Sequence, residues 1–149
     1  MQPQRYWREI PQRYRLEAGL CRKCGKVFMP PRGVCDSCRS TDFEMVRLSD
    51  KGRIHTFTVI RIPPSGFGEQ VPYVLAVVEL DDGVRPLPMV SGGGTPAPET
   101  PGAVRLTMQV ADCEPEDVRI GDPVRLEFRK INEVGKSGVI CYGYKAVPA

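Results

Sequence analysis

Short stretches of apolar residues, separated by glycine, proline and charged residues, dominate the chain after residue 52. Each stretch has the length of a β-strand and is bounded by residues that favour turns, which predicts strands rather than helices. We expect six strands, at residues 53–62, 73–80, 84–90, 104–111, 124–131 and 139–145. Pro86 and Pro88 restrict the third strand to a sheet edge or a bulge, because proline lacks the N–H that a central strand donates.

These strands predict a small β domain. No intervening segment carries a helical apolar period long enough for a crossover helix, so antiparallel pairing of neighbouring strands is expected. In the first strand, Ile54 and Ile60 share one face while Phe57 lies on the other, so both faces are partly apolar, as in a closed barrel. We therefore predict a mostly β fold in which residues 51–149 form a five- to six-stranded antiparallel OB-fold barrel.

The first 20 residues differ from this pattern. Tyr6, Trp7 and Ile10 have helical spacing, which predicts a short amphipathic helix that ends near Pro11 within an N-terminal arm, residues 1–20. Such a helix is too short to be stable alone. We expect its tryptophan to dock on the rest of the chain or on another protein.

Four cysteines in residues 21–50 carry the strongest chemical signal. They form two Cys-x-x-Cys pairs separated by ten residues: Cys21 with Cys24, and Cys35 with Cys38. Two tight turns with this spacing supply four tetrahedral thiolate ligands, which predicts a zinc ribbon with a structural Zn(II) ion. Because so short a segment cannot bury a core of its own, metal binding is expected to supply its folding free energy. A redox-active site would need a single pair in a βαβ context, which the sequence lacks.

The chain has 149 residues, of which 41% are hydrophobic, enough for one compact domain and a small appendage. Its net charge of +3 is unevenly distributed, since residues 1–53 carry 12 Lys or Arg and 6 Asp or Glu, whereas residues 54–149 carry 9 and 12. Four zinc-bound thiolates would reduce the positive charge of the first part. The charge is therefore weak support for nucleic-acid binding.

No apolar run is long enough to cross a bilayer, and the N-terminus lacks the apolar region of a signal peptide. We expect a cytoplasmic protein that does not bind membranes. In that reducing compartment the six cysteines are not expected to form disulfides.

The remaining candidate sites favour structural roles. His55 alternates with core positions, and Cys113 and Cys141 are expected to be packing residues. The glycine- and proline-rich segment 91–102 is expected to be a long loop rather than a phosphate cradle. A Ser-His-Asp set, paired carboxylates, a Rossmann fingerprint and a Walker loop are all absent from the sequence, so we assign no catalytic residue.

Several segments in order resemble one family. They are Tyr6-Trp7, the four cysteines with Pro30-Pro31-Arg32 between the pairs, and residues 52–58, 72–80 and 120–124. Together they resemble proteins that join a rubredoxin-like zinc ribbon to an OB-fold, catalogued as domain of unknown function thirty-five. The segment 91–102 looks longer than is usual there.

The resemblance implies a non-catalytic, zinc-binding accessory subunit of a thiolase-like enzyme, needed for acyl-CoA carbon–carbon bond cleavage or formation. Known branches are a benzoylsuccinyl-CoA thiolase of anaerobic toluene degradation, an acetoacetyl-CoA thiolase complex and a steroid side-chain aldolase. It also implies a heterotetramer of two plus two chains and a coenzyme A thioester at their interface. Four cations of the ribbon are candidates to contact CoA phosphates or the partner: Arg22, Lys23, Lys26 and Arg32.

Two other functions compete with this interpretation. A single-stranded nucleic-acid-binding OB-fold module would need exposed aromatic residues, whereas the strand aromatics are expected to lie mostly in the core: Phe57, Tyr73, Phe128, Tyr142 and Tyr144. An independent thiol enzyme would need a reactive Cys113 or Cys141. The four ribbon cations also have a simpler interpretation as a solvated basic surface.

Overall fold

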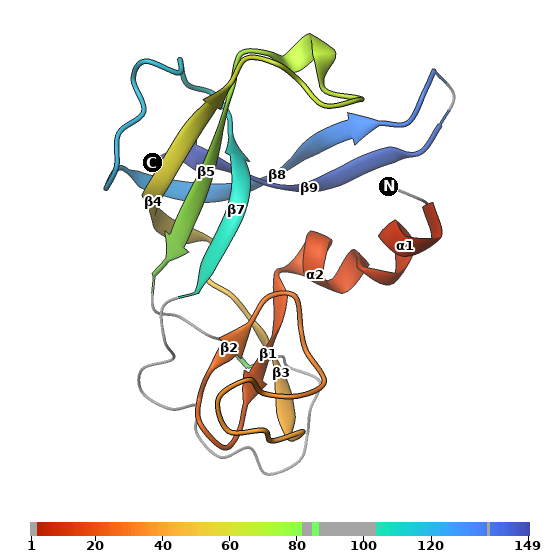
Figure 1. Cartoon of the computed structure of the whole chain (residues 1–149), viewed down its shortest axis with the longest axis vertical. Coiled ribbons are helices and arrows are strands. Elements are labelled where there is room, and N and C mark those ends of the chain that lie inside the picture. Colours follow the sequence, from red (N-terminus) through yellow and green to blue (C-terminus); the bar gives the residue numbers. More distant parts are fainter. Residues whose placement is uncertain (1–2, 82–84, 87–103, 137) are drawn as a thin grey trace.

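The computed structural model describes residues 3–81, 85–86, 104–136 and 138–149 (Figure 1). An N-terminal helical arm leads into a small sheet, and the small sheet is followed by a β-barrel. The segment 91–102, expected to be a loop, lies outside the described residues. No helix of the described residues is long and apolar enough to span a membrane.

The arm contains two helices, α1 at Pro3–Arg8 and α2 at Ile10–Arg15. The predicted helix end near Pro11 is therefore wrong, because Pro11 lies in the first turn of α2 instead. Proline is tolerated there since the first N–H groups of a helix have no acceptor within it. Leu16 ends α2 in the left-handed conformation, with φ of 52°. The arm thus continues directly into the first strand.

The small sheet has the strand order β2-β1-β3-β6. Its strands are β1 at Glu17–Cys21, β2 at Val27–Phe28, β3 at Phe43–Arg47 and β6 at Arg85–Pro86. The described part of the predicted strand 84–90 therefore pairs with β3 and not with the barrel, and the rest lies outside the described residues. Pro86 lies in an edge strand of this sheet, as its missing N–H requires.

The barrel closes in the order β4-β5-β7-β9-β8. Its strands are β4 at Lys51–Ile60, β5 at Tyr73–Leu80, β7 at Arg105–Val110, β8 at Pro123–Glu133 and β9 at Ile140–Pro148, with a 3₁₀ turn at Gly68–Gln70. This confirms the predicted five- to six-stranded barrel, which has five strands, with strand bounds shifted by up to a few residues. One pairing differs from the antiparallel prediction, because β7 and β9 meet in parallel at Val110 and Ala146.

β8 and β9 form a hairpin that extends beyond the barrel and runs beside the arm (Figure 1). β4 pairs with β8 only between Lys51 and Arg53, so most of the hairpin has no further strand partner. The arm packs on this extension: the ring of Tyr14 in α2 lies 4.9 Å from that of Phe128, edge to face.

One hydrophobic core joins the small sheet to the barrel. Leu20 and Val46 from the small sheet belong to the same buried cluster as Val74 and Val78 from the barrel. Each of these four side chains is nearly inaccessible to solvent. Because protein interiors are close-packed, the shared core holds the two parts in a fixed relative position.

Candidate functional site

The four predicted metal ligands lie together at one end of the small sheet. The sulfur atoms of Cys21, Cys24, Cys35 and Cys38 all lie within 4.8 Å of one another. The Sγ atoms of Cys21 and Cys38 are 3.5 Å apart, as are those of Cys24 and Cys35. Four thiolates bound to zinc at about 2.3 Å in a tetrahedron would be about 3.8 Å apart, so the cluster fits this ion.

Two turns of the same geometry present these sulfurs. The N–H of Gly25 donates to the carbonyl of Cys21 at 2.8 Å, and the N–H of Arg39 donates to the carbonyl of Cys35 at 3.1 Å. Gly25 and Arg39 each follow the second cysteine of a pair and adopt positive φ, at 75° and 58°. Glycine adopts this conformation without strain, whereas arginine does so at a cost. The second turn therefore has the geometry of the first, although an arginine and not a glycine occupies its left-handed position.

Backbone N–H groups prepare the cluster for ionisation. Those of Cys38 and Ser37 lower the pKa of the Cys35 thiol to about 6. The N–H of Lys26 also lowers the pKa of the Cys24 thiol. Desolvation and the neighbouring sulfurs have a larger effect in the opposite direction, and they raise the pKa of Cys24 to about 12. Four adjacent sulfurs become thiolates together only when a cation compensates their charge. The donor set therefore suits Zn(II), whose binding releases the remaining protons.

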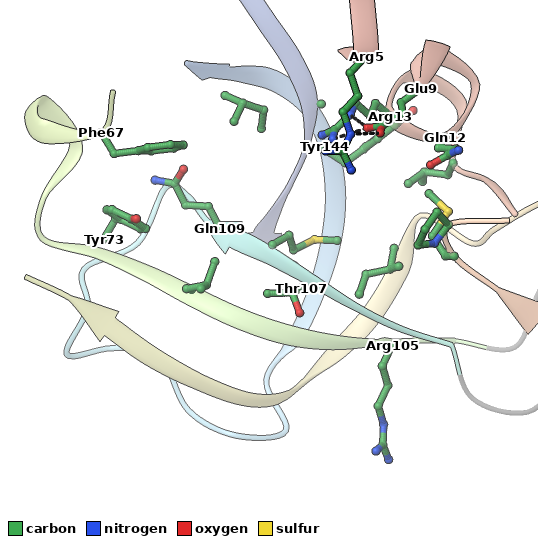
Figure 2. A pocket seen from close by; sticks show the side chains of 18 of the residues that line it. Arg5, Glu9, Gln12, Arg13, Phe67, Tyr73, Arg105, Thr107, Gln109 and Tyr144 are labelled. Atoms are coloured by element: carbon green, nitrogen blue, oxygen red, sulfur yellow. Dashed lines mark hydrogen bonds and ion pairs between the residues drawn. The ribbon is translucent and has the colours of Figure 1, made fainter. Parts of the chain in front are cut away.

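The four ribbon cations named from the sequence are close to the metal ligands in the chain, and none of them lines the groove shown in Figure 2. Lys26 Nζ lies 2.6 Å from Asp36 Oδ1, and Arg32 reaches Oδ2 of the same carboxylate at 3.9 Å. Arg22 lies 3.6 Å from Glu44 and 3.8 Å from Asp42. Lys23, which is exposed, forms no ion pair with the described residues. Lys23 is therefore the most available of the four for an external anion.

A groove of about 790 Å³ lies where the arm, the small sheet and the barrel meet (Figure 2). Its apolar walls include Leu16, Met29, Phe67, Tyr73, Leu106 and Tyr144. Its polar groups include Arg5, Glu9, Gln12, Arg13, Arg105, Thr107 and Gln109. No local sequence pattern predicts this groove, because its walls come from distant segments that only the folded chain brings together.

Glu9 organises the arginines on the arm side of the groove. It accepts hydrogen bonds from Nε of Arg13 at 2.8 Å and from Nε of Arg5 at 3.2 Å (Figure 2). The bond from Arg13 is the main reason why the pKa of Glu9 is lowered, so this carboxylate stays charged at neutral pH. The Arg13 guanidinium also lies 4.9 Å from the centre of the Tyr6 ring. The spacing Arg5-Glu9-Arg13 was visible in the sequence and indicates such a helical network.

The solvent exposure of individual side chains tests several other predictions made from the sequence. Trp7 is 73% exposed, so it does not dock on the described part of its own chain. Phe128 and Tyr142 are 45% and 37% exposed, which contradicts their expected place in the core. Their rings stack with centroids 5.7 Å apart. His55 lies on the surface at an irregularity of β4, with Nδ1 3.8 Å from Glu79 Oε2.

The two cysteines outside the metal cluster are poor nucleophiles. Cys141 is buried, and Cys113 packs against the main core. Burial is the main cause that raises the pKa of Cys113, and nearby carboxylates of Asp117 and Glu114 act in the same direction. A raised pKa leaves little thiolate at neutral pH, which agrees with packing roles and disfavours a thiol enzyme.

Comparison with known proteins identifies both parts of the chain. Residues 8–44 match a family model described as the rubredoxin-like zinc ribbon domain of ChsH2, and residues 45–129 match the C-terminal OB-fold domain of ChsH2. A DUF35 domain-containing scaffold protein from Methanocaldococcus jannaschii is 41% identical over 145 residues, which cover 97% of this chain and 89% of the relative. The chain belongs to the DUF35 family. Its four clustered cysteines are those of the family's zinc ribbon.

Two further similarities extend this result. The benzoylsuccinyl-CoA thiolase subunit BbsA of Thauera aromatica is 29% identical to this DUF35 chain over 119 residues, which cover 78% of the chain and 76% of the relative. A solved structure described as an Ltp2-ChsH2(DUF35) aldolase has a TM-score of 0.65 and 23% identity, and the match covers 99% of this chain and 96% of the other. At that identity the solved structure shows the shared fold.

Proposed function

We propose that this DUF35 chain is a non-catalytic accessory subunit that binds a thiolase-like enzyme and is required for acyl-CoA carbon–carbon bond formation or cleavage. The observation that carries the proposal is the similarity to a scaffold protein and to a thiolase subunit across both the zinc ribbon and the barrel. A similarity confined to the four cysteines would be common to unrelated zinc ribbons. The cysteine-rich ribbon suits the reducing cytoplasm.

The surface supports a role in assembly. Trp7 is the only tryptophan of the chain and presents 73% of its surface on a helix of six residues. A large exposed aromatic residue is typical of the centre of a protein interface, where it fills a pocket of the partner. The exposed Phe128–Tyr142 pair lies on the hairpin that packs against the same arm. Arm and hairpin together form the surface that we assign to the catalytic partner.

The ribbon cations support a contact with the coenzyme A thioester where it would lie between the ribbon and the partner. Phosphate oxygens favour guanidinium and ammonium groups, and Lys23 with Arg22 is the exposed pair nearest the metal cluster in sequence. We propose that these cations, with Lys26 and Arg32, meet CoA phosphates or acidic groups of the partner. The proposed assembly is a heterotetramer of two accessory and two catalytic chains, which matches the two-fold symmetry common in soluble oligomers.

Similarity also bears on which branch of the family we propose. Identity to the scaffold protein is 41% over 145 residues, against 35% over 77 residues and 29% over 119 residues for two BbsA subunits. The longer and closer match favours a scaffold role over benzoylsuccinyl-CoA cleavage or steroid side-chain cleavage. The acyl group would then be selected by the catalytic partner.

Affinity purification from the native host tests the proposal. The tagged, zinc-loaded chain is purified at about 0.3 M salt with nuclease added, because these conditions disrupt contacts to nucleic-acid phosphates. A stoichiometric thiolase-like protein is the expected result. Substitution of Arg22 and Lys23 by alanine should then weaken the complex or raise the KM of the partner for its acyl-CoA. If both quantities stay unchanged, the proposed role of these two cations is wrong.

A single-stranded nucleic-acid-binding module is the second candidate. The exposed, stacked rings of Phe128 and Tyr142 favour it, because bases stack on such rings. The same purification distinguishes the two functions. Recovery of nucleic acid at low salt without nuclease, and of no thiolase-like protein at the higher salt, would support the nucleic-acid function instead.

A further inference from the structure

The edge of strand β7 faces the groove. Five consecutive residues of β7, from Arg105 to Gln109, line it. Successive side chains of a strand point to opposite faces, so a groove lined by all five meets the strand at its edge. Figure 2 shows β7 running through the groove with Arg105, Thr107 and Gln109 following one another along it.

The hydrogen-bond pattern identifies which backbone groups point into the groove. The N–H of Leu80 in β5 donates to the carbonyl of Val104 at 2.9 Å. Backbone N–H and C=O groups of an antiparallel strand point alternately toward its two edges. Like those of Val104, the backbone groups of Leu106 and Met108 therefore point toward β5. The backbone groups of Arg105 and Thr107 point away from β5. These two residues therefore turn their backbone groups toward the other edge of β7.

That other edge is paired with β9 at one end only. The N–H of Ala111 donates to the carbonyl of Ala146 at 2.8 Å, and Val110 opposite Ala146 is the one residue pair between the two strands. Among the described residues, the N–H and C=O groups of Arg105 and Thr107 have no strand partner. An unpaired strand edge is a template for another strand.

The walls of the groove indicate what kind of strand fits. Leu16, Met29 and Tyr144 give one side an apolar surface. On the arm side, Arg5 and Arg13 share the single carboxylate of Glu9, which leaves one positive charge in excess. Arg105 is already paired with Glu79, at 2.8 Å. Side chains of an added strand alternate between two directions. An extended segment with alternating apolar and acidic residues therefore complements both sides.

We propose that the edge of β7 binds an extended segment of the catalytic partner, about five residues long, with apolar and acidic residues in alternation. The added strand pairs its backbone with Arg105 and Thr107 and places its apolar side chains against Leu16, Met29 and Tyr144. This inference rests on the proposed function, because it assigns the occupant to the thiolase-like partner. The arm then forms one wall of the binding site rather than a free appendage.

Amide hydrogen exchange in the chain alone and in the purified complex tests this inference. We expect the amides of Arg105 and Thr107 to exchange rapidly in the chain alone and about tenfold or more slowly in the complex. Slow exchange in the chain alone would contradict the inference, because the edge would already be covered. Rapid exchange in a stable complex would also contradict it while leaving the proposed function intact. Protection by acetyl-CoA without the partner would assign the edge to a small ligand instead.

A matched pair of variants separates backbone pairing from side-chain effects. Thr107→Pro removes the N–H that faces the groove, at an edge position where proline is tolerated, whereas Thr107→Ala keeps it. We expect Thr107→Pro to weaken binding of the partner about tenfold or more and Thr107→Ala to leave it unchanged. Equal affinities of two folded variants would contradict the inference. If Thr107→Pro does not fold, the exchange experiment decides, and failure to form any complex would overturn both proposals.

Discussion

The hydroxyl of Tyr144 in β9 donates a hydrogen bond to the carbonyl oxygen of Tyr14 in α2, at 3.2 Å and across 130 positions of the sequence. Tyr144 also packs edge to face against Phe128, which in turn contacts the ring of Tyr14. The bond links the arm to the extended hairpin. It therefore fixes the wall of the groove that the arm provides.

Removal of this hydrogen bond should loosen the arm. We expect Tyr144→Phe to lower the free energy of unfolding by about 1 kcal/mol, the usual net contribution of one such bond. Trypsin should also cleave faster after Arg13 and Arg15, which lie in α2. Tyr142→Phe is the matched control, since it makes the same chemical change two residues away on the exposed face. Equal cleavage rates in the two variants would contradict the role of the bond.

Tyr6 should make stability depend on pH in the alkaline range. Burial is the main cause that raises its pKa from 10.0 to about 12. The folded chain therefore holds the hydroxyl proton of Tyr6 more firmly than the unfolded chain does. The contribution of this protonated hydroxyl to the free energy of unfolding is fully present below pH 10 and is lost as the pH rises to about 12. The loss reaches about 2–3 kcal/mol, from 1.36 kcal/mol for each pH unit.

Tyr6→Phe isolates this effect. The hydroxyl of Tyr6 is buried and has no hydrogen-bond partner among the described residues, so its removal should leave stability at pH 7 unchanged or slightly higher. Between pH 10 and 12 the variant should lose less stability than the natural chain in urea unfolding. A parallel loss in both proteins would show that Tyr6 is not the group responsible.

The local patterns of the sequence predicted most of the elements. The metal cluster was predictable because its four ligands lie within 18 residues and their spacing carries the geometry. The barrel strands were predictable because alternation and turn residues mark each of them. The groove was not predictable, since no local pattern states that Arg5 and Arg105 line one groove at a junction of three parts.

Two errors had identifiable physical causes. Pro11 was interpreted as a helix end, yet proline suits the first turn of a new helix equally well. Phe128 and Tyr142 were expected in a barrel core, but they lie on the part of the hairpin that extends beyond it. Alternation shows which residues share a face, whereas only the tertiary structure shows whether that face is covered.

Loss of zinc should destabilise the whole chain rather than the ribbon alone. Leu20 and Val46 of the small sheet share the core of the barrel, so unfolding of the ribbon exposes one side of that core. We expect chelation, or Cys35→Ser, to abolish the one bound zinc per chain and to lower Tm by about 10 °C or more. Cys113→Ser should keep the metal. An unchanged Tm after complete removal of zinc would contradict the shared core.

Trp7 should contribute to binding of the partner and little to folding. Because its side chain is 73% exposed, Trp7→Ala should change the free energy of unfolding by less than about 0.5 kcal/mol. Affinity for the thiolase-like partner should fall about thirtyfold or more, as for a central interface tryptophan. Ile120→Ala is the control, since Ile120 is 68% exposed in the segment between β7 and β8, away from the arm (Figure 1). Equal affinities of the two variants would place the interface elsewhere.

The most direct test of the central claim is the activity of the purified thiolase-like partner, measured with and without this chain. The accessory role predicts that activity on acyl-CoA rises on addition of the zinc-loaded chain and saturates at one chain per catalytic chain. The chain alone should show no activity on acyl-CoA. The metal-free Cys35→Ser variant should not raise the activity of the partner. Full activity of the partner alone, unchanged by the chain at any ratio, would contradict the account.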